Sequence, residues 1–220
     1  MLSVNEEKSV LDSELFHRLE KDELLSALSF FSAQKKSYKK GECLRAAGDK
    51  FEFFGLVLSG TVQVFFDDIN GERVIMASVA EGGTFGESLC YLDVSSSPVW
   101  IYADSDATVL WLSCERLRGN VCGDAVAMKM QSRFTTMLAH KALAQNDRVQ
   151  ILSKLTLREK LNTYFSQCVR TYKSRTFTIP LDRESLAIYL GSNRSALSRE
   201  LSNMQSEGLI DFYKNSFKIL

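Results

Sequence analysis

A short run near the carboxyl end of the chain contains side chains that can read the edges of nucleic-acid bases. Arg194 and Arg199 bracket two serines, Ser195 and Ser198. An arginine can donate two hydrogen bonds to O6 and N7 of one guanine, and serine hydroxyls suit bases or phosphates. Asn193 comes directly before the run, where its side chain can cap a helix. The spacing predicts a helix that presents these residues to double-stranded DNA at its amino end.

The residues around this run fit a helix-turn-helix. Ala187, Gly191 and Leu197 lie four and six residues apart. They provide a small residue where two helices touch, a glycine for the tight turn and an apolar anchor beneath the second helix. Residues 208–220 then fit a β-hairpin wing, with Lys214 near its tip for phosphate contact. An ordinary helical hairpin with solvated arginines is the alternative, but the turn, the caps and the anchors agree, so we predict DNA binding.

Residues 85–103 contain a second candidate site. Gly86 and Glu87 open a short apolar turn, and an aromatic-rich segment resumes after a serine-rich loop. Such an arrangement can cradle a small anion, yet the stretch contains no Lys or Arg. A bound phosphate would therefore lack its charge-assisted partner. An uncharged or weakly polar ligand, or no ligand at all, fits these residues better.

The cysteines and histidines do not form a recognisable metal site. Cysteines occur at positions 43, 90, 114, 122 and 168, and the histidines are His17 and His140. Their spacing does not suit zinc, and the cysteines are too scattered for an iron–sulfur cluster. Each histidine lies within a helical pattern, where an axial haem ligand is not expected. We therefore expect no metal and no cofactor, and reduced thiols in a cytoplasm.

Cys90 lies within the apolar turn and leaves a further alternative open. A thiol at that position could sense oxidation, although most such cysteines are simply small buried apolar residues. No nucleophile–base pair occurs at recognisable spacing elsewhere, so we expect no enzyme activity.

The composition is that of an ordinary globular protein, with 220 residues of which 45% are hydrophobic and 25% charged. No apolar run approaches the roughly 20 residues that span a bilayer, and the polar, acidic amino terminus does not resemble a secretion signal. We expect a cytoplasmic protein with no membrane partner. The zero net charge conceals an asymmetry, because residues 1–150 have 16 basic and 21 acidic side chains, whereas residues 151–220 have 11 and 6. A basic carboxyl-terminal part fits a polyanionic partner.

Three patterns follow one another along the chain. Residues 13–33 have helical spacing, residues 37–112 fit short strands with glycine-rich turns, and Asn70-Gly71 predicts a tight hairpin. After Arg118, apolar residues recur at every seventh position, as on a long helix. This predicted seam consists of Met130, Met137, Ala144 and Ile151, flanked by Phe134 and Leu155. The helix could lie on its own barrel, but we favour a dimer helix, because a helix of this length needs a partner.

With these motifs the chain resembles, nearly end to end, the cyclic-AMP receptor protein / fumarate-nitrate regulator (CRP/FNR) family of bacterial transcription factors. KKGECLRAAGDKFEFFGLVLSGTVQVFF is similar to the family's first barrel strands, GGTFGESLCYL to its effector-pocket turn and RSALSREL to its recognition helix. The resemblance implies an α+β chain. An N-terminal cyclic-nucleotide-binding-like β-roll (jelly roll) with N-terminal helices occupies residues 1–118, a long dimerisation helix and hinge 119–152, and a C-terminal winged helix-turn-helix 153–220. It also implies a homodimer that binds a palindromic operator and, if it is an activator, contacts RNA polymerase.

The resemblance assigns roles to the DNA-binding residues one by one. Arg199 matches the family's guanine-reading arginine, and Arg194 matches an arginine that contacts DNA in the cyclic-AMP branch. Ser195 stands where both well-known branches tend to have glutamate, and Ser198 where the oxygen-sensing branch has serine. The expected half-site is therefore related to neither consensus in full.

At the sensor end, the cyclic-AMP branch closes its phosphate site with Arg-Ser or Arg-Thr, and the matching positions here are Ser97 and Pro98. They lack the bidentate cation and one backbone N–H donor, so cyclic AMP is not expected. Leu143 and Ala144 match the positions that read adenine by hydroxyls. The effector site expected from the turn and the resemblance comprises Gly86, Glu87, Ser88, Leu89, Ser97, Pro98, Trp100, Leu143 and Ala144. Two alternatives stay open: a regulatory module that acts through protein partners, and a cysteine-based redox regulator.

Overall fold

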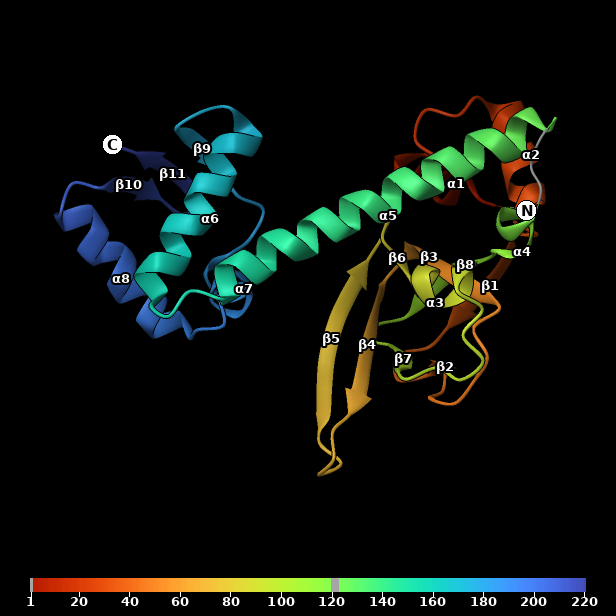
Figure 1. Ribbon diagram of the computed structural model, residues 1–220, viewed down its shortest axis with the longest axis horizontal. Coiled ribbons are helices and arrows are strands. Elements are labelled where there is room, and N and C mark those ends of the chain that lie inside the picture. Colours follow the sequence, from red (N-terminus) through yellow and green to blue (C-terminus); the bar gives the residue numbers. More distant parts are fainter. Residues whose placement is uncertain (1, 120–122) are drawn as a thin grey trace. The chain divides into compact units, whose positions relative to one another are not determined.

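The computed structural model of the protein describes residues 2–119 and 123–220. It divides into two compact units, the first ending at Leu138 and the second beginning at Ala139 (Figure 1). Each unit has its own hydrophobic core. Within the described ranges, none of the helices combines the length and the hydropathy that a membrane span requires.

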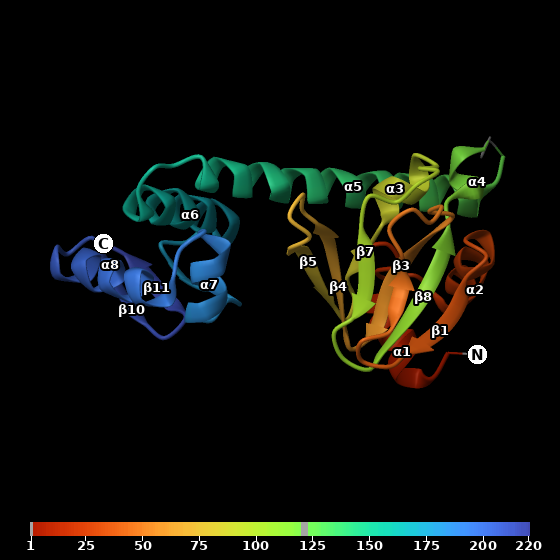
Figure 2. The ribbon, with the colours of Figure 1, turned by 90° about the horizontal axis from the view of Figure 1, so that it is seen from below.

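The first unit is a β-roll made of two four-stranded antiparallel sheets (Figure 2). One sheet has the order β1-β8-β3-β6, formed by Gln34–Tyr38, Ala107–Ser113, Phe53–Ser59 and Thr84–Phe85. The other has the order β2-β7-β4-β5, formed by Cys43–Arg45, Trp100–Ala103, Thr61–Asp67 and Arg73–Ala80. The hairpin predicted at Asn70-Gly71 joins β4 to β5, with Gly71 at a φ of 77°. The Asp68 carboxylate stabilises this turn by accepting the backbone N–H of Asn70 at 2.8 Å.

The helices of the first unit are α1 (Val4–Asp12), α2 (Lys21–Phe30), α3 (Glu87–Tyr91), α4 (Glu115–Arg118) and the first part of α5 (Ala125–Leu152). The single helical pattern predicted over residues 13–33 is wrong, because the chain turns between α1 and α2. The backbone N–H of Glu20 donates to the Glu23 carboxylate at 3.2 Å and starts α2 there. Leu15 and Phe16 are fully buried nonetheless, since the turn places them in the core.

The long helix α5 is present, but most of the apolar row selected from the sequence as a dimer seam is buried inside the chain. Met130 and Met137 are 0% and 1% exposed in the first core. Phe134 lies between them and packs against Phe54, with 5.6 Å between the ring centroids. Ile151 is fully buried in the second core. The alternative, a helix that lies on its own barrel, is therefore correct for Met130, Phe134 and Met137, whereas Ile151 packs in the core of the second unit.

The second unit consists of three helices and a small sheet. The helices are α6 (Leu157–Tyr172), α7 (Arg183–Tyr189) and α8 (Arg194–Ser206). The sheet has the order β10-β11-β9, formed by Ile210–Tyr213, Ser216–Ile219 and Thr176–Thr178. The predicted wing is the hairpin β10–β11, and β9 adds a third strand that the sequence pattern did not reveal. Phe165 of α6 packs against Phe217 of the wing, with 5.0 Å between the ring centroids, so α6 covers the small sheet.

Candidate nucleic-acid interface and effector turn

The turn between α7 and α8 has the geometry that its sequence predicts. Gly191 has a φ of 62°, in the left-handed region that favours glycine. The Asn193 side chain accepts the backbone N–H of Ala196 at 2.8 Å and caps α8. Ala187 and Leu197 are 1% and 0% exposed, so the two helices meet as expected at a small residue and an apolar anchor.

The outer face of α8 presents the predicted polar residues to solvent. Arg194, Ser195, Ser198 and Arg199 are all exposed on its first two turns. The only hydrogen bond described for the Arg199 side chain is a weak one, from Nε to the Ser195 carbonyl at 3.4 Å. The free backbone N–H groups and the dipole at this end of a helix favour an anion. The face can therefore donate hydrogen bonds to phosphates and to base edges together.

An ion-pair cluster that sequence reasoning missed fixes α8 to α6. Arg158 of α6 contacts the Glu200 carboxylate at 2.5 Å, and its Nη1 and Nη2 donate to Glu207 at 2.6 and 2.7 Å. Hydrogen bonds from the guanidinium lower the pKa of Glu207 below its ordinary value. Glu200 lies one residue after Arg199, about 100° further round the helix, so the cluster holds α8 on the face beside the exposed arginines. No sequence motif marks such a pair, because its partners are 42 and 49 residues apart.

The wing places Lys214 at its tip, as predicted. Lys214 has a φ of 50° and lies between β10 and β11, with its ammonium 5.5 Å from the centre of the Tyr213 ring. The Arg183 guanidinium donates to the Lys214 carbonyl at 2.8 Å and lies over the rings of Phe212 and Phe217. Burial against these rings lowers the pKa of Arg183. The tip is thus tied to the start of α7.

The turn at Gly86 is tightly packed. Gly86 has a φ of 76°, and a Cβ there would lie 2.1 Å from the Phe51 ring, so only glycine fits. Glu87 is 4% exposed, and its carboxylate accepts the Thr84 hydroxyl at 3.3 Å. Ser88 is exposed and Leu89 half-buried. Glu87, Ser88 and Leu89 thus lie together at the start of α3, and of the three only Ser88 is exposed to solvent.

Ser97 stabilises the loop in which it lies. It is 3% exposed, and its hydroxyl donates to the Val99 carbonyl at 2.8 Å. Its backbone N–H donates to Asp49, and its carbonyl accepts from Gly48, each at 2.8 Å. The hydrogen bonds described for Ser97 therefore join its own loop to the loop between β2 and β3, while the adjacent Pro98 is exposed. The contacts are those of a structural residue.

Trp100 faces away from the roll's core. Ile101 and Ala103 of β7 are 1% and 2% exposed and point into it. Alternation along a strand places Trp100 and Tyr102 on the other face, where their rings lie 6.3 Å apart. Trp100, predicted as an effector-site residue, therefore lies on the face of β7 that points away from the core. Leu143 and Ala144 lie on the part of α5 that belongs to the second unit, and both are exposed there.

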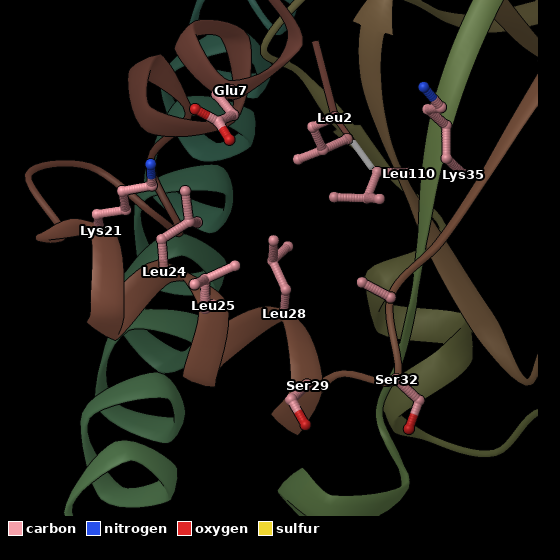
Figure 3. A pocket seen from close by; sticks show the side chains of 11 residues that line it. Leu2, Glu7, Lys21, Leu24, Leu25, Leu28, Ser29, Ser32, Lys35 and Leu110 are labelled. Carbon is pink, nitrogen blue, oxygen red and sulfur yellow. The ribbon is translucent and has the colours of Figure 1, made fainter. Parts of the chain in front are cut away.

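A cavity of about 580 Å³ lies elsewhere in the first unit, between the amino-terminal helices and the sheet edge (Figure 3). Leu28 of α2 faces Leu2 and Leu110 across it, with Lys21 and Glu7 at one side. Sequence reasoning missed this cavity, because its walls come from distant parts of the chain.

The described thiols are reduced, with Cys43 exposed and Cys90, Cys114 and Cys168 buried. Cys122 lies outside the described residues. Across residues 2–119 and 123–220, no group of three or more His, Cys, Asp or Glu side chains could hold a metal ion.

The fold and the exposed arginine–serine face define a DNA-binding regulator with a winged helix-turn-helix and a β-roll domain. Two family models match the chain: the cyclic nucleotide-binding domain over residues 35–121 and the Crp-like helix-turn-helix domain over residues 149–220. The chain belongs to the CRP/FNR family, whose members are transcription regulators and not enzymes.

Similar proteins include two transcription regulators. The transcriptional activator protein FnrA of Stutzerimonas stutzeri is 24% identical over 204 residues, which cover 89% of this chain and 80% of that protein. The cyclic AMP receptor protein of Thermus thermophilus is 26% identical over 203 residues, covering 90% and 88%.

Solved structures show the same fold. DNR from Pseudomonas aeruginosa has a TM-score of 0.51 at 19% identity, covering 100% of this chain and 96% of that one. The c-di-GMP-responsive regulator CLP of Xanthomonas campestris has a TM-score of 0.52 at 16% identity, covering 89% and 98%. At such identities the likeness concerns the fold alone.

Proposed function

We propose that the protein acts as a homodimer that binds a palindromic operator through α8. The observation that supports this most directly is the exposed set on the first two turns of that helix, which consists of Arg194, Ser195, Ser198 and Arg199. Asn193 and Lys214 would add contacts at the helix start and the wing tip. Two such helices related by a dyad reach successive major grooves about 34 Å apart, so the half-sites form an inverted repeat.

The proposed operator is tested by selecting bound duplexes from a random-sequence pool and footprinting the enriched sequence. We expect an inverted repeat, with affinity that falls as salt rises. A regulatory module that acts only through protein partners would enrich no sequence, and that outcome would reject the proposal. Similarity to a transcriptional activator supports RNA polymerase as a further partner, and binding to a chromosomal operator would require a cytoplasmic protein.

The dimer seam we propose lies on a row of α5 different from the buried one. Seven exposed, uncharged residues follow one another at alternating spacings of four and three: Met128, Ser132, Thr135, Ala139, Ala142, Asn146 and Val149. This is the heptad pattern of a two-stranded coiled coil, and its small side chains let two helices approach closely. Met128 and Val149 are 48% and 63% exposed in the single chain, which leaves apolar surface for a second copy. Sedimentation velocity tests the dimer.

For the sensor domain we propose an effector other than cyclic AMP, or none. Ser97 is buried and hydrogen-bonded within its own loop, and Pro98 has no N–H to donate, so neither can serve as a phosphate clamp. The buried Glu87 carboxylate adds negative charge to the turn and opposes a phosphate. Isothermal titration with cyclic AMP tests this: saturable binding in the micromolar range would reject it.

A further inference from the structure

The cavity between the amino-terminal helices and the sheet edge is not used by the proposed function. Its floor is apolar: Leu24 of α2 and Leu110 of β8 are 4% and 3% exposed, and Leu2 and Leu28 are half-buried. Leu28 faces Leu2 and Leu110 across the space (Figure 3). A volume of about 580 Å³ is within the range of small-molecule sites, which combine apolar walls with a few polar groups at fixed places.

Of the described residues, three with charged side chains line the cavity, and one of these is already paired. The Lys35 ammonium lies 3.1 Å from each carboxylate oxygen of Glu6. The other two, the half-buried Glu7 of α1 and Lys21 at the start of α2, lie together at one side of the cavity (Figure 3). Neither the Glu7 carboxylate nor the Lys21 ammonium has an ion-pair or hydrogen-bond partner in the described part of the chain. The cavity therefore has one negative and one positive group available on the same side, next to an apolar floor.

This pair of opposite charges selects the class of small molecule that fits. A fatty acid would bring its carboxylate to Lys21 but also to Glu7 on the same side, so attraction and repulsion would offset each other. An alkylamine would meet the same conflict with the charges reversed. A molecule with both an ammonium and a carboxylate next to an apolar group can pair with both side chains at once. It would also compensate the half-buried Glu7 carboxylate for its partial loss of hydration.

We propose that this cavity binds an α-amino acid with an apolar side chain. The ammonium of the ligand donates to the Glu7 carboxylate, its carboxylate accepts from the Lys21 ammonium, and its side chain lies against Leu24, Leu28 and Leu110. Because these residues come from α1, α2 and β8, the bound amino acid would hold both helices against the sheet. The site lies within the first unit, so the inference stands or falls separately from DNA binding.

The test is isothermal titration of the full-length protein with L-phenylalanine and with its two analogues that each lack one charged group. These are 3-phenylpropanoate, without the ammonium, and 2-phenylethylamine, without the carboxylate. We expect saturable binding of L-phenylalanine with a Kd of about 1 mM or lower. Each analogue should bind at least about ten-fold more weakly, because it leaves Glu7 or Lys21 unpaired. No saturable binding of L-phenylalanine, or equal binding of either analogue, would overturn the proposal.

Substitutions at the cavity locate the bound molecule. Glu7→Gln should remove the preference for L-phenylalanine over 3-phenylpropanoate, because the ammonium then has no anionic partner, and Lys21→Gln should likewise remove the preference over 2-phenylethylamine. Asp12→Asn is the matched control, since Asp12 is exposed on α1 and does not line the cavity, and it should keep both preferences. Preferences that survive in the Glu7 and Lys21 variants, or that are lost in the control, would contradict this site. The titrations of the unaltered protein need no substitution, so a variant that fails to fold does not remove the test.

Discussion

The guanidinium of Arg183 donates a hydrogen bond to the backbone carbonyl of Lys214 at 2.8 Å, so the first residue of α7 holds the tip of the wing. Lys214 has a φ of 50°, a backbone conformation that residues other than Gly, Asn and Asp seldom adopt. The stacking of Arg183 on Phe212 and Phe217 fixes the guanidinium where it can hold this conformation. The residue that positions the wing is thus part of the helix-turn-helix itself.

Arg183→Ala should lower the free energy of unfolding of the protein by about 1–3 kcal/mol, because it removes the ring contacts and the bond to the wing tip together. Urea unfolding followed by circular dichroism measures this loss. Arg175→Ala is the control, since Arg175 is exposed just before β9 and should change stability by less than about 0.5 kcal/mol. Equal stability of the two variants would show that Arg183 does not anchor the wing.

Arg199→Ala should weaken binding to the selected operator by about 1–3 kcal/mol and relax one G·C preference. The reason is the loss of two hydrogen bonds to one guanine, while phosphate contacts remain. The measurement is a titration of labelled operator at fixed salt, with Arg175→Ala as the control for general loss of charge. Unchanged affinity together with unchanged base preference would remove Arg199 from the interface.

Ala142→Glu should convert the dimer into a monomer, because it places two carboxylates against each other in the proposed seam. Sedimentation velocity distinguishes the two masses. Ala144→Glu changes the same side chain on the opposite face of α5, at a position of the row first selected from the sequence, and should leave a dimer. The reverse result would reject the new row and place the dimer contact on the face of α5 that contains Ala144.

Ser97→Arg, the change that would supply a cation for a phosphate, should lower stability by about 1–3 kcal/mol, because the buried Ser97 site has no room for a longer side chain. Pro98→Ser alters the exposed neighbour and should have little effect. Thermal unfolding of the two variants makes the comparison. A Ser97→Arg protein as stable as the parent would mean that the loop opens more easily than its hydrogen bonds indicate.

The helix-turn-helix could be predicted in detail because its signals are local. The cap at Asn193, the turn at Gly191 and the anchor at Leu197 lie within seven residues, and each has one structural meaning that the others support. Short-range hydrogen bonds and tight turns depend on neighbours in the chain, so the sequence contains almost all the relevant information.

The dimer seam and the sensor domain were harder to predict because they depend on which face is covered. Met130 and Met128 lie on the same helix, and the periodicity of α5 does not say which of their rows meets the β-roll. Likewise, side chains alternate between the two faces of β7, and the sequence does not say whether Trp100 and Tyr102 or their neighbours Ile101 and Ala103 face the core. Ser97 looked like an altered ligand position, whereas its contacts to Asp49 and Val99 depend on a loop closure that no motif records.

Gly86 has no freedom to vary whether or not the turn ever binds a ligand. Its left-handed backbone and the Phe51 ring against its missing Cβ are independent demands, so shrinking the ring would relieve only one of them. Any descendant of this protein would retain the glycine as long as it kept the fold. A glycine at this position in related sequences would therefore reflect packing and not ligand binding. Effector specificity must depend on side chains that the fold leaves free to change.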